Sequence, residues 1–154
     1  MAKKFFERWE KLNWQNLDWK NYFFAEVSAL AYHDGTRAMR ELNKIGFKNY
    51  KFLENDGAQC HIFSDEENIV VAFRGTEPSK INDVMADLNL IKGAAKAGGN
   101  LHSGFQKEVN DLWMDIVKEL EHNDQLKVRK DVYMTGHSLG AAMATIAATR
   151  YKPE

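Results

Sequence analysis

The 154-residue sequence has little of what marks several classes of protein. It holds one cysteine, Cys60, which cannot form an internal disulfide and fits a reducing compartment. Residues 1–8, MAKKFFER, lack the uninterrupted apolar core of a signal peptide. No apolar run approaches the roughly 20 residues needed to cross a bilayer. We therefore expect a cytoplasmic chain with at most peripheral membrane contact.

An excess of charge of one sign is also missing. The sequence has 21 basic and 22 acidic residues, a formal net charge of -1, without strong segregation along the chain. This excludes the electrostatic footprint of a nucleic-acid-binding protein. The hydrophobic content of 44% and charged content of 28% are ordinary for a soluble globular protein, and the length predicts a single domain.

Residues 1–19 are rich in aromatic side chains and form a possible accessory N-terminal helix. Trp9, Trp14 and Trp19 recur every five residues, which rotates them around a helix and spoils a single membrane-facing stripe. We expect this segment to pack against the domain rather than to bind a membrane.

The rest of the chain alternates between helical and strand patterns. Helices are expected at residues 21–32, 36–44, 105–120 and 139–151. Strands are expected at residues 59–64, 68–73 and 131–135. The first two strands flank the charged turn Asp65-Glu66-Glu67 and suggest an antiparallel hairpin, and the continuously apolar run 69–73 predicts a strand covered on both faces. Strand, crossover helix and strand then predict a parallel βαβ unit in an α/β fold.

The clearest chemical signal is Gly136-His137-Ser138-Leu139-Gly140, which lies between an expected strand and an alanine-rich helix. A serine on a sharp strand-to-helix turn has a strained backbone, so the residues two before and two after it must be nearly free of side chain. This pattern predicts a nucleophile elbow with Ser138 as the nucleophile. The side chain of His137 is expected to point away from the serine hydroxyl, as a packed structural residue rather than a base.

A serine nucleophile needs an oxyanion hole for the charge that builds on the attacked carbonyl oxygen. One donor in an elbow enzyme is the backbone N–H of the next residue, here Leu139. The second comes from a loop after an earlier central strand, where Arg74-Gly75-Thr76 stands, and Thr76 is the candidate.

These segments resemble a known family. The matching motifs, in order, are Ala72–Thr76, Asp83–Leu88, Leu101–Phe105 and Gly136–Gly140. They are similar to those of the class 3 lipases, the fungal-triacylglycerol-lipase-like α/β-hydrolases, over about residues 59–151. The resemblance implies the N-terminal portion of an α/β-hydrolase fold, with a mixed, mainly parallel sheet flanked by helices. It also implies an acyl ester or lipid substrate, the roles given above to Ser138, Thr76 and Leu139, a structural His102, and a lid helix at Ser79–Asp87.

The histidine and acid of a Ser-His-Asp triad are missing from the expected place. In this fold they follow the serine, yet residues 139–154 contain no histidine, no aspartate and only Glu154 as a carboxylate side chain. The upstream histidines His33, His61, His102 and His122 stay possible because triads are defined by geometry. We therefore expect a chain that is truncated after the elbow and has little activity alone. We also expect strand 131–135 to form an exposed edge of the sheet, which could pair with a complementing segment or a second chain.

Two other functions remain open. The same elbow could act on a non-lipid ester, thioester or amide, and the fold could serve binding or assembly without catalysis. No cofactor is implied. No metal site is implied either, because Cys60 and His61 would face opposite sides of a strand and Asp65-Glu66-Glu67 reads as a solvated turn.

Overall fold

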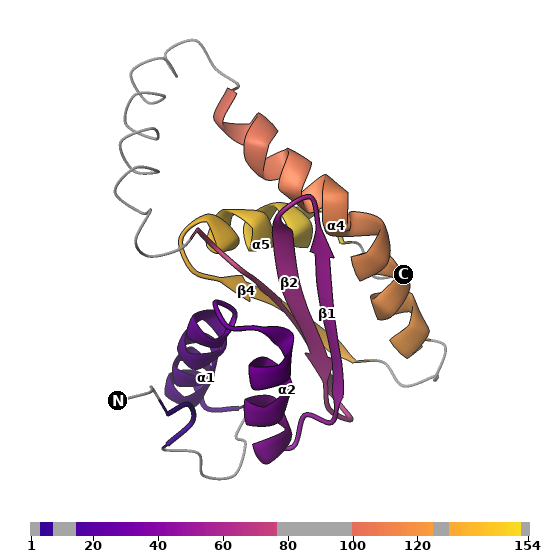
Figure 1. Ribbon diagram of the computed structural model, residues 1–154. Helices are drawn as coiled ribbons and strands as arrows, with labels where there is room; N and C mark the ends of the chain where they lie inside the picture. Colours follow the sequence, from indigo (N-terminus) through magenta and orange to yellow (C-terminus); the bar gives the residue numbers. More distant parts are fainter. Residues whose placement is uncertain (1–3, 8–14, 77–99, 125–129, 152–154) are drawn as a thin grey trace.

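The computed structural model describes residues 4–7, 15–76, 100–124 and 130–151, and it forms a sheet with helices on both faces (Figure 1). The strands are β1 (Asn49–Asn55), β2 (Ala58–Ser64), β3 (Asn68–Phe73) and β4 (Asp131–Gly136). The helices are α1 (Leu17–Leu30), α2 (Gly35–Lys44), α4 (Asn100–Asp124) and α5 (Leu139–Arg150). The helices predicted at residues 21–32, 36–44, 105–120 and 139–151 and the three predicted strands are present with shifted ends, and β1 is an addition.

The sheet has the order β1-β2-β3-β4. β1 pairs with β2, and β2 with β3, in antiparallel fashion, whereas β3 and β4 are parallel. The antiparallel hairpin and the βαβ unit are thus confirmed. The expectation of a mainly parallel sheet is wrong for the described residues, where one pair of three is parallel, because short turns join β1 to β2 and β2 to β3 and only a crossover such as α4 permits parallel pairing.

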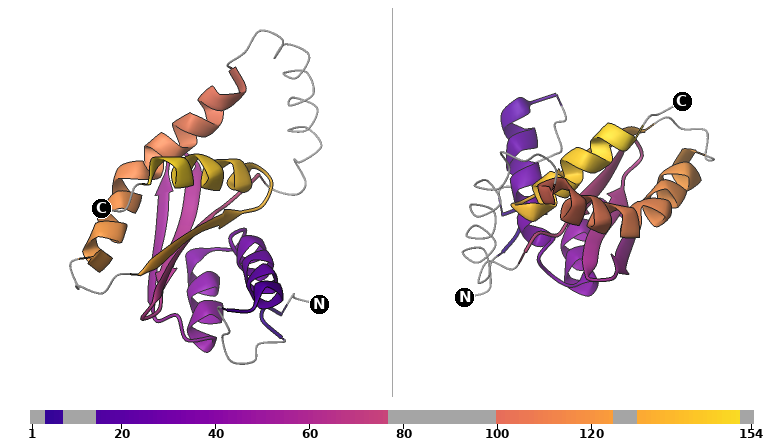
Figure 2. Two further views of the ribbon diagram at one scale, coloured as in Figure 1. Left: turned by 180° about the vertical axis from the view of Figure 1, so that it is seen from behind. Right: turned by 90° about the horizontal axis from the view of Figure 1, so that it is seen from above.

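The helices form two layers, with α4 and α5 on one face of the sheet and α1 and α2 on the other (Figure 2). Strand β3 is buried on both faces, as its sequence predicts. Ile69, Val71 and Phe73 join the core under α4 and α5, whereas Val70 and Ala72 join the core under α1 and α2. This alternation follows from the two-residue repeat of a strand, and it fixes the central position from which the loop at residues 74–76 leaves the sheet.

The N-terminal segment packs against the domain. Phe5 and Phe6 are buried in the core beneath α1 and α2. Residues 4–7 are not helical, and Phe6 has a φ of 57°; helix α1 begins only at Leu17, where the Asn16 side chain accepts a hydrogen bond from the Trp19 amide (3.0 Å). The remainder of the possible helix at 1–19 lies largely outside the described residues.

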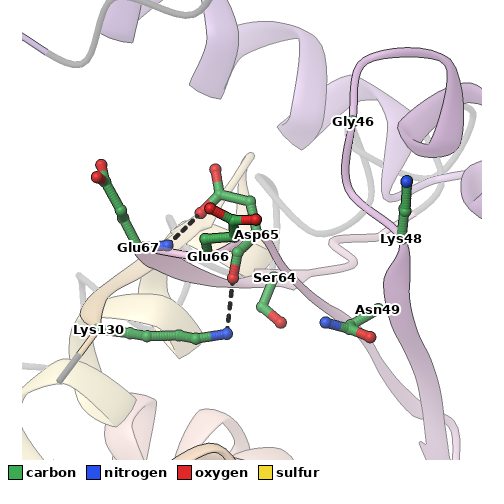
Figure 3. Close-up of a pocket in the computed structure, with 8 residues that line it drawn as sticks. All are labelled: Gly46, Lys48, Asn49, Ser64, Asp65, Glu66, Glu67 and Lys130. Carbon is green, nitrogen blue, oxygen red and sulfur yellow. Dashed lines mark hydrogen bonds between the residues drawn. The ribbon is translucent and has the colours of Figure 1, made fainter. Parts of the chain in front are cut away.

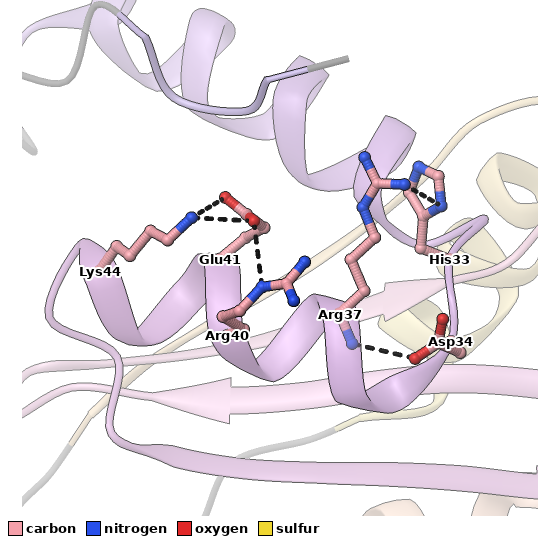
Figure 4. Close-up of polar contacts among 6 residues, drawn as sticks. All are labelled: His33, Asp34, Arg37, Arg40, Glu41 and Lys44. Carbon is pink, nitrogen blue, oxygen red and sulfur yellow. Dashed lines mark hydrogen bonds and ion pairs between the residues drawn. The ribbon is translucent and has the colours of Figure 1, made fainter. Parts of the chain in front are cut away.

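Helix α2 is held by local polar contacts on its surface (Figure 4). Asp34 caps its first turn by accepting a hydrogen bond from the Arg37 amide (2.9 Å), which lowers the pKa of that carboxyl. At the other end Glu41 accepts a hydrogen bond from Lys44 (2.9 Å), and this contact lowers the Glu41 pKa. These are contacts along one helix, and they stabilise α2 rather than forming a site.

Candidate active site

Ser138 lies in the turn between β4 and α5, where the sequence places a nucleophile elbow. Its backbone has φ 57° and ψ -124°, a conformation that an L residue adopts only under strain. The residue is exposed and its side chain makes no capping hydrogen bond to the helix that follows. The turn is closed instead by backbone bonds from Gly140 N–H to the His137 carbonyl and from Ala141 N–H to the Ser138 carbonyl, both 3.0 Å.

The two glycines of the motif occupy positions where no side chain fits. A Cβ on Gly136 would lie 2.3 Å from the carbonyl carbon of Gly140, and one on Gly140 would lie 2.4 Å from the Phe73 carbonyl oxygen. Both neighbours are backbone atoms, which cannot turn aside as a flexible side chain can. The steric reason given for the Gly-x-Ser-x-Gly spacing is therefore met in the structure.

The loop after β3 packs directly against the elbow. A Cβ on Gly75 would lie 2.4 Å from the His137 carbonyl oxygen and 3.2 Å from the Gly140 amide nitrogen. Thr76 and Leu139, the candidate oxyanion-hole residues, line one cavity of about 310 Å³. The sequence singled out both residues, but it did not show that Gly75 must lack a side chain for the two segments to meet.

His137 has a partner far away in the sequence. Its Nδ1 lies 3.0 Å from the Tyr32 hydroxyl, and the two rings meet edge to face. The same hydroxyl would be 2.7 Å from a Cβ on Gly75, so Tyr32 touches both the elbow and the loop after β3. His137 is exposed, so the expectation of a packed side chain is wrong, but its hydrogen bond makes it a structural residue of the turn.

Of the upstream histidines, His61 and His33 make structural contacts. His61 is buried, and its ring nitrogens lie 2.7 Å from the Tyr50 hydroxyl and 3.1 Å from the Ala31 carbonyl oxygen. Burial lowers the His61 pKa to about 4, so the ring is neutral near pH 7. His33 packs edge-on against Phe5, and His122 is exposed near the end of α4. The side chain of His102 and the expected lid segment Ser79–Asp87 lie outside the part of the chain that the structure describes.

Larger cavities lie elsewhere. A cavity of about 630 Å³ lies at the opposite end of the sheet, around the turn at Asp65 and around Lys130 (Figure 3). Two more flank β4, one of about 760 Å³ against α1 and one of about 530 Å³ against α5. Ligands in open α/β sheets bind outside the carboxyl ends of the strands, which is where Ser138 and Thr76 lie. Both candidate oxyanion-hole residues, Thr76 and Leu139, line the cavity of about 310 Å³, and this favours it over the larger cavity beside Gly136 and His137.

Metal ligands do not gather in the described part of the chain. Nowhere in it do three histidine, cysteine, aspartate or glutamate side chains come together as ligands would. Cys60 is buried, and burial raises the pKa of its thiol. The groups beside Ser138 in the described residues are its own strained turn and the loop at residues 74–76 that packs against it.

Comparison with known proteins agrees with this arrangement. Residues 70–153 match the family described as Lipase (class 3). The chain belongs to the class 3 lipase family. No solved structure shows a significant match. Within the described residues no helix of this family member is long and apolar enough to span a membrane.

Curated relatives carry lipase names. The protein named secreted mono- and diacylglycerol lipase LIP2 of Malassezia restricta is 32% identical over 113 residues, which cover 67% of this chain and 36% of the relative. The protein named secreted mono- and diacylglycerol lipase MDL2 of Malassezia globosa is 32% identical over 93 residues, covering 55% of this chain and 31% of the relative. The class 3 lipase chain thus spans about a third of the length of these relatives.

Proposed function

We propose that the protein is a serine hydrolase of lipid esters that acts through an acyl-enzyme at Ser138. The Ser138 hydroxyl attacks the ester carbonyl, and the N–H groups of Leu139 and Thr76, with the Thr76 hydroxyl, stabilise the negative oxygen that forms. The alcohol then leaves, and water hydrolyses the acyl-serine. The observation that carries this proposal is the strained Ser138 turn packed against Gly75, which brings Thr76 and Leu139 to one cavity.

The general base and its acid belong to the same proposal. Residues 139–154 hold neither histidine nor aspartate, and His61 is tied to Tyr50 and Ala31. We therefore propose that full turnover depends on a histidine and an acid supplied by a complementing segment or a second chain. Among the described strands β4 is the last in the sheet and pairs only with β3, which supports pairing along its outer edge.

The substrate class follows from the relatives' names. Both are named mono- and diacylglycerol lipases, and we propose partial acylglycerols as substrates of this protein. The cytoplasmic location expected from the sequence stays a prediction, which cell fractionation tests.

Two measurements test the hydrolase proposal. A fluorophosphonate should form a single adduct on Ser138, located by peptide mass spectrometry, and Ser138→Ala should abolish it. Hydrolysis of p-nitrophenyl butyrate should be weak in the 154-residue chain and rise strongly when the chain is extended by its downstream coding sequence. Ser138→Ala should then lower the rate of the extended chain by about a thousandfold or more.

The outcomes separate the competing functions. No adduct in either form would contradict the hydrolase and favour a binding or assembly protein. Adduct formation with turnover of thioesters or amides but not acylglycerols would contradict the lipid substrate. Robust Ser138-dependent turnover by the 154-residue chain would contradict only the proposal that the base comes from elsewhere.

A further inference from the structure

The cavity beside Ser138 has a polar wall whose chemistry goes beyond the oxyanion hole. Besides Thr76 and Leu139 it is lined by Gly57, Gln59, Arg74, Gly75 and Glu108, and it measures about 310 Å³. This is near the lower end of the range for small-molecule sites, roughly 300–1,000 Å³. By contrast, the cavity of about 760 Å³ on the α1 side of the elbow is lined by residues such as Phe24, Ala25 and Ala29. A fatty acyl chain gains little from the smaller, polar cavity.

Glu108 is the carboxylate of this wall. It lies on α4, half-buried, and its side chain has no hydrogen bond or ion pair within the described residues. The adjacent cation, Lys107, is bonded instead to Asp56 and Asp111. Burial raises the Glu108 pKa because the charged form loses hydration, and the charge of the neighbouring Lys107 offsets this only in part. A half-buried ionisable group without a structural partner, in a cavity, is typical of a ligand contact.

The other polar groups of the wall are engaged with one another. Arg74 donates from Nη1 to the Gln59 side-chain oxygen (2.8 Å), and the backbone N–H of Arg74 donates to the Gln59 carbonyl (3.0 Å). An ionised carboxylate only accepts hydrogen bonds, so the ligand group that suits Glu108 is a donor. A neutral hydroxyl fits this need, whereas a fatty-acid carboxylate offers Glu108 no donor.

We propose that Glu108 is a specificity-determining residue that accepts a hydrogen bond from a free hydroxyl on the alcohol part of the ester. This rests on the proposed function, because it takes the cavity beside Ser138 as the place of the ester's alcohol group. Partial acylglycerols carry such a hydroxyl, and fully esterified or simple alkyl esters do not. An ester without the hydroxyl leaves the carboxylate dehydrated and unpaired, and a site built in this way discriminates against it.

A binding experiment tests this without turnover. The Ser138→Ala chain, labelled with ¹³C at glutamate, is titrated with acid and base in the presence of 1-monobutyrylglycerol or methyl butyrate. A donated hydrogen bond favours the charged carboxylate, so the monoacylglycerol should lower the Glu108 pKa and the methyl ester should leave it unchanged. Glu108→Gln identifies the signal, and the resonance of the exposed Glu121 on the same helix should not respond to the addition of either ester.

A kinetic experiment measures the consequence in the form of the protein that turns over. Glu108→Ala should lower kcat/KM for monobutyrylglycerol about tenfold relative to methyl butyrate, as expected for a hydrogen bond to a charged group. The ratio of kcat/KM for monobutyrylglycerol to that for methyl butyrate in Glu108→Gln should lie between the ratios of the wild type and Glu108→Ala. Glu121→Ala should keep the wild-type ratio.

The results distinguish this proposal from the hydrolase itself. A Glu108 signal that neither ester shifts, or that both shift equally, overturns the role of Glu108 while leaving Ser138 chemistry untouched. An equal loss of both substrates in Glu108→Ala overturns it too, because a merely structural residue would act in that way. Loss of the fluorophosphonate adduct, in contrast, bears on the proposed function alone.

Discussion

The turns at the two ends of the sheet differ in how their backbone groups are bonded. One is the turn at Asp65, at the far end from the active-site candidate, and the other is the elbow at Ser138. At the far end, Asp65 Oδ1 accepts hydrogen bonds from the amides of Glu67 (2.9 Å) and Asn68 (2.7 Å), and its carbonyl accepts one from Lys130 (2.6 Å). At the elbow end Ser138 is strained and exposed without a cap. Cavities are present at both ends, one of about 630 Å³ at the far end and two of about 310 and 760 Å³ at the elbow end. The elbow end is therefore distinguished by its strained, uncapped serine rather than by the presence of a cavity.

The largest expected effect comes from adding one methyl group at the elbow. Gly140→Ala would place a Cβ 2.4 Å from the Phe73 carbonyl oxygen and 3.1 Å from the Gly75 amide nitrogen. Because both atoms belong to the backbone, the clash forces β3 and the elbow apart, and we expect a loss of about 3 kcal/mol or more in the free energy of unfolding. Urea denaturation measures it.

Gly46→Ala, at the far end, is the matched control. Gly46 has φ +101° but no atom within 4 Å of the added Cβ, so its cost is limited to backbone strain of about 1–2 kcal/mol. Equal losses in the two variants would show that the elbow is no more tightly packed than an ordinary turn.

Acid should loosen the elbow end through His61. The ring binds Ala31, next to Tyr32, which in turn contacts His137 and Gly75. The folded pKa is about 4 and the unfolded value 6.5, so the unfolded chain takes up a proton first as the pH falls. Stability is therefore full above about pH 6.5 and declines towards pH 4, by at most about 3 kcal/mol.

His61→Gln isolates this contribution, because glutamine offers an amide donor for the Ala31 carbonyl and does not titrate. The variant is expected to start less stable than the wild type and to lose less stability between pH 6.5 and 4. The charged groups that influence the His61 pKa are Asp34, His33 and Arg74, and all three are still present in the variant. Parallel pH curves for the two proteins would contradict a role for His61.

A change at the far end should affect stability alone. Asp65→Ala removes the acceptor of two backbone N–H groups, and we expect a loss of about 1–2 kcal/mol. Asp65→Asn keeps one side-chain oxygen and should lose less. Neither variant should change the rate of fluorophosphonate labelling at Ser138, and a slower rate would show that the two ends are coupled.

The parts of the fold predicted from the sequence are those with a local signal. The continuous apolar run predicted β3 and its burial on both faces, and the Gly-x-Ser-x-Gly spacing predicted the elbow. In strand β1 exposed and part-buried residues alternate only from Asn49 to Phe52, and this pattern was too short to be recognised in the sequence. Its signal was the Asp56-Gly57 pair, whose φ values of 49° and 86° are those of a tight hairpin turn.

The parts of the site that escaped prediction depend on contacts between distant segments. Tyr32 and His137 are 105 residues apart in the sequence, and no local sequence pattern predicts their hydrogen bond. Glu108 looked like one of many helical carboxylates until the fold placed it beside Thr76 and Leu139. The residues of a motif can be predicted from their spacing in the sequence. The residues that surround the motif in space are known only once the packing of distant segments is known.

The smallest effect tests the strain at Ser138 itself. Ser138→Gly and Ser138→Ala both remove the nucleophile, but φ 57° with ψ -124° is accessible to glycine and costly for alanine. After the greater entropy of glycine in the unfolded chain is subtracted, Ser138→Gly should be the more stable of the two by about 1 kcal/mol. At Lys118, exposed on helix α4, the same pair of substitutions should give the opposite order, since alanine is favoured in a helix by about 1 kcal/mol. Denaturant unfolding of the four variants measures these free energies. If alanine were more stable than glycine at both positions, the turn at Ser138 would be relaxed.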